Sequence, residues 1–317
     1  MPKAMLSLLA LGLLVGCGGP SAADSGRLVL REGQWVPAPV PEKGTAAGEF
    51  ELALLHLERG NNRTVVKAAN RFLKRYPDSP LGEEVMLLAI RAELARGRYM
   101  QAYEWCEKLL ERYPTGEHYE GVVRQEYDIA EAFLQGRKQI VLGFLYLPAE
   151  DEGLSILTRV AEHMPGSDLA EDALLRIAEY HFEREDYARA ADAYDDYLAL
   201  FARSPRAPFA MYRAALAIFR TYRGPAYEAG PLIEAELRFS EFESDYPLIS
   251  DDVGVGALLD SIAEARARKD FRIARFYERT GYPEAAAFYY REVIERHRQP
   301  VVAGDAHRAV RTVLVQE

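Results

Sequence analysis

The chain has 317 residues, enough for one elongated domain or two compact ones. Its 49 acidic residues outnumber its 39 basic ones, and the resulting net charge of −10 disfavours a nucleic-acid-binding surface, which needs an excess of cations.

The first residues predict a secretory signal peptide over 1–16. A single cation, Lys3, precedes an apolar stretch at 5–15, which is about half as long as a membrane-spanning helix must be. The sequence LVGC at 14–17 resembles the lipobox of bacterial lipoproteins, in which diacylglycerol is attached to the cysteine before cleavage. The resemblance implies that Cys17 is the lipidated first residue of the mature chain. A soluble secreted protein with a chance cysteine is the alternative.

The resemblance also implies a location. Gly18 stands where inner-membrane lipoproteins often carry Asp, which favours sorting to the outer membrane with the protein facing the periplasm. Several acyl chains on one residue anchor a protein far more firmly than a single chain does. Residues 17–48 are then the lipidated N-terminus and a flexible tether, within which LVLREGQWV at 28–36 predicts a small hairpin around Glu32 and Gly33.

From Phe50 onward the apolar residues recur with the 3.6-residue period of helices. Similar segments recur along this part, as in FLKRYPDSP at 72–80 and LLERYPTGE at 109–117. When these segments are aligned, the residue that follows the aromatic residue or its substitute is Pro77, Pro114, Pro165, Ala202, Pro247 or Arg298. Pro77 and Pro114 lie 37 residues apart, which is close to the length of a tetratricopeptide unit.

A second feature has the same period. Twelve residues before these positions stand Val65, Ala102, Gly153, Ala190, Ala235 and Ala286. Small residues at one place in every unit predict that two helices cross closely there. The resemblance to tetratricopeptide repeats is clearest at 174–198 and 272–297. We therefore expect an all-α solenoid of five to six tetratricopeptide-like helical hairpins over residues 49–300.

Three segments interrupt the period, at 135–153, 219–236 and 248–270. Inserted loops of solenoids often contact partners. For the apolar residues 141–147, two interpretations stay open: a segment that folds back over the superhelix, which we favour slightly, or a docking surface. Residues 301–317 form either a capping helix or a tail, and the apolar spacing within them favours a helix.

The sequence contains no known catalytic motif. It has no phosphate-binding loop, HExxH, GxSxG or calcium loop. The histidines, none at ligand spacing from another, are His56, His118, His163, His181, His297 and His307. Cys106 lies on an apolar helical stripe and is expected to be a buried small hydrophobe. We therefore predict a binding protein without catalytic residue, metal or cofactor, and no small-molecule substrate.

In a helical-repeat solenoid, the first helix of each unit lines a concave groove that binds extended peptides or helices. Counting from the close-packing positions gives the groove candidates Leu54, Glu58, Arg91, Glu179, Phe182, Glu183, Arg275 and Arg279. Their mixed charges, with apolar residues between, suit a peptide better than a phosphate chain.

The lipobox, the Tyr-Pro hairpin ends at 76–77, 113–114 and 246–247, and the stretch 211–247 together resemble the BamD (YfiO) family of outer-membrane lipoproteins. The resemblance implies a subunit of the machinery that inserts β-barrel proteins into the outer membrane. Its partners would be unfolded barrel proteins, held by the N-terminal repeats, and the integral β-barrel assembly subunit, contacted by the C-terminal repeats.

Other functions remain open on the sequence. One is a lipoprotein scaffold for Tol-Pal and cell-division complexes, or for pilus-secretin assembly. Another, from a different class, is a cell-wall hydrolase or its activator.

Overall fold

The computed structural model describes residues 28–31, 34–37, 42–141, 144–296 and 302–315. The expected signal peptide and Cys17 lie outside the described residues. Within the described ranges, no helix combines the length and the apolar character needed to cross a membrane.

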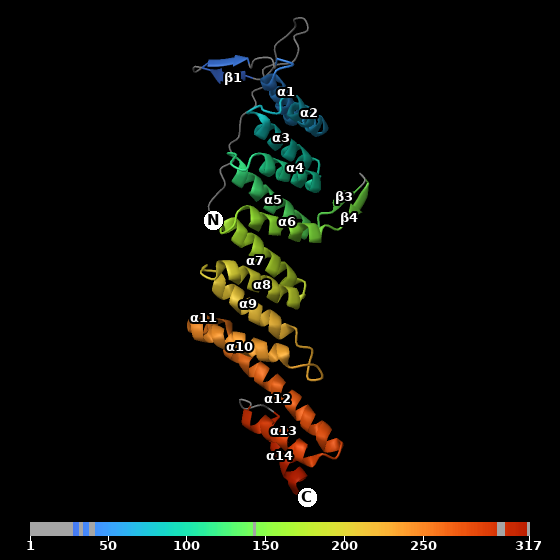
Figure 1. The fold of residues 1–317 in the computed structure, drawn as a ribbon, viewed down its shortest axis with the longest axis vertical. Coiled ribbons are helices and arrows are strands. Elements are labelled where there is room, and N and C mark those ends of the chain that lie inside the picture. Colours follow the sequence, from blue (N-terminus) through green and yellow to red (C-terminus); the bar gives the residue numbers. More distant parts are fainter. Residues whose placement is uncertain (1–27, 32–33, 38–41, 142–143, 297–301, 316–317) are drawn as a thin grey trace, which may run out of the picture.

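Fourteen helices of the described chain stack one after another into an elongated solenoid (Figure 1). Six hairpins can be traced: α1 (Ala46–Glu58) with α2 (Asn62–Arg75), α3 (Gly82–Ala95) with α4 (Tyr99–Arg112), α5 (Tyr119–Leu134) with α6 (Glu150–His163), α7 (Asp168–Glu183) with α8 (Tyr187–Phe201), α9 (Ala207–Arg220) with α10 (Gly230–Asp245), and α12 (Val255–Arg279) with α13 (Pro283–Arg296). The short α11 (Pro247–Val253) precedes the last hairpin, and α14 (Ala303–Val315) packs on α13. The prediction of an all-α solenoid of helical hairpins is confirmed.

The same turn closes five of the six hairpins. A residue with positive φ follows the first helix, and the next residue's N–H donates to a carbonyl five positions back, as in Arg98 to Glu93 at 2.9 Å. The positive-φ residue is Gly60, Gly97, Gly136, Glu185 or Gly281. Glu185 is the exception, because a side chain with a Cβ strains this left-handed conformation.

The predicted crossing positions all fall on the second helix of a hairpin and are all buried. They are Val65, Ala102, Gly153, Ala190, Ala235 and Ala286. At Gly153 the two helices approach closely, since an added Cβ would lie 3.0 Å from the backbone oxygen of Ala130 on α5. The prediction that small residues permit close helix crossing is confirmed.

The hydrophobic core is divided along the solenoid. One large cluster runs from Ala69 to Ala173, and smaller clusters fill the remaining hairpins. Cys106 is fully buried in the large cluster, as predicted, and burial raises the pKa of its thiol. Each hairpin therefore packs mainly against its neighbours in the stack.

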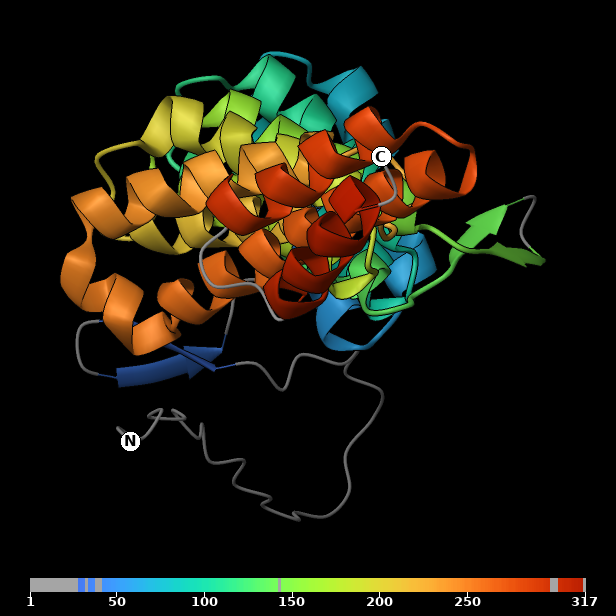
Figure 2. The same cartoon turned by 90° about the horizontal axis from the view of Figure 1, so that it is seen from below.

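Two short antiparallel hairpins interrupt the helical pattern. The predicted hairpin of the tether is present as β1 (Leu28–Arg31) paired with β2 (Gln34–Pro37). The second, β3 (Gln139–Val141) with β4 (Leu145–Leu147), projects from the side of the solenoid (Figure 2), and its strand β3 contacts α4. Phe144 is 74% exposed and Tyr146 62% exposed. The favoured interpretation, that this segment folds back over the superhelix, is wrong for the described residues 144–147, because their large apolar side chains are exposed.

The other two insertions give a long connection and a short additional helix. Residues 221–229 form a long connection between α9 and α10, and residues 247–253 add the short helix α11. The 25-residue α12 then carries the chain into the last hairpin.

Candidate functional site

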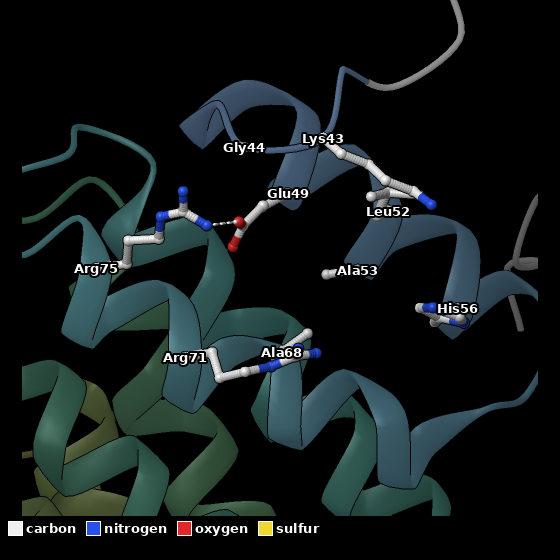
Figure 3. Close-up of a pocket in the computed structure, with 9 residues that line it drawn as sticks. All are labelled: Lys43, Gly44, Glu49, Leu52, Ala53, His56, Ala68, Arg71 and Arg75. Atoms are coloured by element: carbon white, nitrogen blue, oxygen red, sulfur yellow. Dashed lines mark hydrogen bonds and ion pairs between the residues drawn. The ribbon is translucent and has the colours of Figure 1, made fainter.

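The clearest hollow in the N-terminal part of the solenoid lies between α1 and α2 (Figure 3). It is an open pocket of about 470 Å³. Its lining residues are Lys43, Gly44, Glu49, Leu52, Ala53, His56, Ala68, Arg71 and Arg75.

Helical spacing places these side chains together. On α1, Glu49, Leu52, Ala53 and His56 follow one another at the i, i+3, i+4, i+7 positions of a single face. On α2, the residues Ala68, Arg71 and Arg75 lie on one face and supply the opposite wall. The pocket thus has a small apolar floor between two helices.

The rim of the pocket is predominantly basic. Its one acid, Glu49, accepts a hydrogen bond from Arg75 at 3.0 Å. Lys43 and Arg71 form no ion pair among the described residues. Because unpaired cations stand beside an apolar floor, the pocket suits an extended segment that combines apolar side chains with a carboxylate.

The sequence-predicted groove residues on α1 and α3 do not line this pocket. Leu54 is half-buried against the core between α1, α2 and α3, whereas Glu58 and Arg91 are exposed. The groove residues predicted from the close-packing positions do not include Glu49, Leu52 and His56, which line the pocket. The spacing of these three residues on one helical face was the available signal.

The groove candidates on α7 lie within a network of side chains. The carboxylate of Glu179 accepts hydrogen bonds from Arg213 at 3.0 and 3.2 Å and from the hydroxyl of buried Tyr194. The Arg213 guanidinium lies over the Phe182 ring, 3.9 Å from its centroid. Glu183 is exposed and lies 3.5 Å from Arg176. Glu179 and Phe182 therefore join α7 to its neighbours α8 and α9.

The remaining candidates, Arg275 and Arg279, are exposed on α12. Arg275 lines an open hollow of about 440 Å³ with Phe271, Tyr290 and residues of α14. The structure thus places all eight candidates on first helices of hairpins, but it spreads them along the solenoid over α1, α3, α7 and α12.

Residues 151–309 match the family YfiO, described as "Outer membrane lipoprotein", and this match covers half of the chain. The chain belongs to the YfiO family. Residues 50–117 of this YfiO-family lipoprotein also match the Tetratricopeptide repeat family. The resemblance to this family and the outer-membrane location predicted from the sequence are both confirmed.

One curated relative is the "Outer membrane protein assembly factor BamD" of Caulobacter vibrioides, 23% identical over 148 residues. The match covers 47% of this chain and 48% of that protein, so it spans about half of the relative's length.

The chain is also similar to solved structures of tetratricopeptide repeat proteins. The C-terminal part of a tetratricopeptide repeat protein from Cytophaga hutchinsonii is 11% identical, with 84% of this chain and 88% of that chain covered and a TM-score of 0.34. A tetratricopeptide repeat protein from Parabacteroides merdae is 13% identical, with 85% and 98% covered and a TM-score of 0.32.

Proposed function

We propose that this lipoprotein is a non-enzymatic component of the complex that assembles β-barrel proteins into the outer membrane. The observation that carries the proposal is the YfiO-family match over 151–309, joined by the relative named as an assembly factor. The lipid on Cys17 would hold the solenoid at the bilayer surface. A captured chain would then be concentrated close to the membrane.

We assign the two ends of the solenoid different partners. The pocket between α1 and α2 would hold extended segments of unfolded barrel proteins, since its basic rim and apolar floor suit such segments. The C-terminal hairpins, with Arg275, Arg279 and the 53% exposed Phe276 on α12, would contact the periplasmic domains of the integral barrel subunit. No cofactor is required, because the work is selective binding.

The first test is an affinity pull-down from detergent-solubilised outer membranes of the native organism. We expect the wild-type chain to retain an integral β-barrel protein with tandem periplasmic domains, and Cys17→Ala to retain less of it. Recovery of secretin, Tol or peptidoglycan-bound proteins in its place would contradict the proposed function.

A second test locates the two binding surfaces by photo-crosslinking in cells. A photoreactive residue at Leu52 should crosslink to newly exported barrel proteins, and one at Phe276 to the integral subunit. The matched control is exposed Lys74, which lies on α2 outside the pocket. Arg71→Glu should weaken the Leu52 crosslink by reversing a rim charge. Equal crosslinking from Leu52 and Lys74 would contradict the assignment of the pocket.

A further inference from the structure

Three ligand-bearing side chains meet where the second and third hairpins pack together. They are Glu107 on α4, Glu126 on α5 and His163 at the end of α6. One potential ligand atom from each lies within 4.8 Å of the other two. These residues are far apart in the sequence, so no short ligand motif marks the cluster.

The buried carboxylate of Glu126 is the unusual feature of this cluster. The side chain is completely buried, and neither carboxylate oxygen has a hydrogen-bond partner within the part of the chain that the structure describes. Its neighbour His163 Nε2 lies 3.7 Å from Oε2, beyond hydrogen-bond distance. A buried carboxylate without a partner is costly, and a bound cation would provide one.

The two distances from His163 to the carboxylates approach those of a metal centre. His163 Nε2 lies 3.2 Å from Glu107 Oε1 and 3.7 Å from Glu126 Oε2. In a tetrahedral zinc site, with bonds of about 2.0 to 2.1 Å, neighbouring ligand atoms are about 3.3 Å apart. We infer that Glu107, Glu126 and His163 bind one divalent transition-metal ion, with Zn²⁺ the best fit, and that water fills the fourth position.

The donor set favours zinc over magnesium or calcium. Zn²⁺ binds both imidazole nitrogens and carboxylate oxygens, whereas Mg²⁺ and Ca²⁺ prefer oxygen ligands alone. Two carboxylates would also neutralise the charge of the ion in this largely buried position. The side chains of Glu107 and His163 are 27% and 20% exposed, so an ion can reach the cluster from solvent.

Two further side chains support Glu107. The hydroxyl of Tyr103 donates a hydrogen bond to Glu107 Oε1 at 2.8 Å, and Arg159 lies 3.8 Å from Oε2. Hydrogen bonds of this kind orient ligating carboxylates. The ion would join three helices of two hairpins. The expectation of a protein without metal is thus replaced by the proposal of a zinc site between two hairpins.

The test uses the purified, untagged full-length chain in detergent, stripped with a chelator and titrated with Zn²⁺ by calorimetry. We expect one ion per chain for the wild type and loss of that ion in Glu126→Gln and His163→Gln. Tyr103→Phe should weaken affinity about tenfold, since it removes only the supporting hydrogen bond. The matched control is His181→Gln, because His181 is also half-buried near a carboxylate, with Nδ1 3.9 Å from Asp186. This control should bind zinc like the wild type.

Circular dichroism establishes that each variant is folded, and zinc-edge X-ray absorption of the wild type gives a measurement that needs no variant. A spectrum with one imidazole and oxygen ligands would support the site. No uptake by the folded wild type, uptake unchanged in the folded Glu126→Gln variant, or a spectrum without imidazole would overturn the proposal.

Discussion

Glu185 shows how one residue can depart from the rule of its repeat. It has a φ of 60° at the turn where four other hairpins have glycine. The N–H of Glu185 still donates to the carbonyl of Phe182 at 3.0 Å, so the turn is kept despite the strain.

The first prediction follows from this strain. Glu185→Gly should raise the free energy of unfolding by about 1 kcal/mol, because glycine adopts a positive φ without a steric penalty. Gly97→Ala, at the equivalent turn, should lower it by a similar amount. Urea denaturation measures both changes. A destabilised Glu185→Gly variant would contradict the argument.

A second prediction at this scale concerns the helix crossing at Gly153. A Cβ there would lie 3.0 Å from the Ala130 oxygen and 3.2 Å from the Phe133 Cβ, so Gly153→Ala must push α5 and α6 apart. We expect thermal unfolding to show a loss of about 1 kcal/mol. The control Gly121→Ala, also helical but with open space around it, should gain roughly 0.5 kcal/mol. Equal stabilisation by both substitutions would show that the crossing tolerates a methyl group.

At the scale of elements, ion pairs between polar side chains connect helices of successive hairpins. Arg176 on α7 donates to Glu131 on α5 at 2.7 Å, and Arg238 on α10 forms a bidentate pair with Asp195 on α8 at 2.6 and 2.8 Å. These contacts hold α7 against α5 and α10 against α8, and so help to orient successive hairpins. Residues 144–147 of the hairpin β3–β4 have no comparable role, since their side chains are exposed.

The third prediction compares how much the β3–β4 hairpin and the buried core contribute to the free energy of unfolding. Phe144→Ser should change the free energy of unfolding by less than about 0.5 kcal/mol, because the Phe144 ring is 74% exposed. Phe133→Ala, in the adjacent helix α5 where the ring is completely buried, should lower it by about 3 to 5 kcal/mol. Chemical denaturation of the two variants provides the comparison. A large loss for Phe144→Ser would mean that the hairpin packs on the solenoid.

The whole molecule is a linear stack in which stability is shared between neighbours only. The last cluster, which contains Tyr290, belongs to α12, α13 and α14 and is separate from the large N-terminal cluster. Damage at one end is therefore expected to remain local.

The fourth prediction tests this locality by hydrogen exchange. Tyr290→Ala removes a buried ring that stacks edge-on with Phe271 and a hydroxyl that donates to Glu278 at 2.6 Å. Amides of α13, α14 and the end of α12 should exchange much faster, because the local loss is about 3 to 5 kcal/mol. Amides of α3 to α6 should keep their rates. Uniform acceleration along the chain would indicate a single cooperative unit.

The sequence by itself determined the helical hairpins, the small residues at their crossings and the burial of Cys106. These depend on local periodicity and on positions repeated within each unit, which a single chain displays directly. Only the tertiary structure decided that β3–β4 projects, that Glu49, Leu52 and Arg71 share a pocket, and that Glu107, Glu126 and His163 meet. The physical reason is that side chains from different hairpins are brought together by the offset between stacked units. Insertions of unequal length change the sequence distance between such side chains, so no fixed spacing marks them.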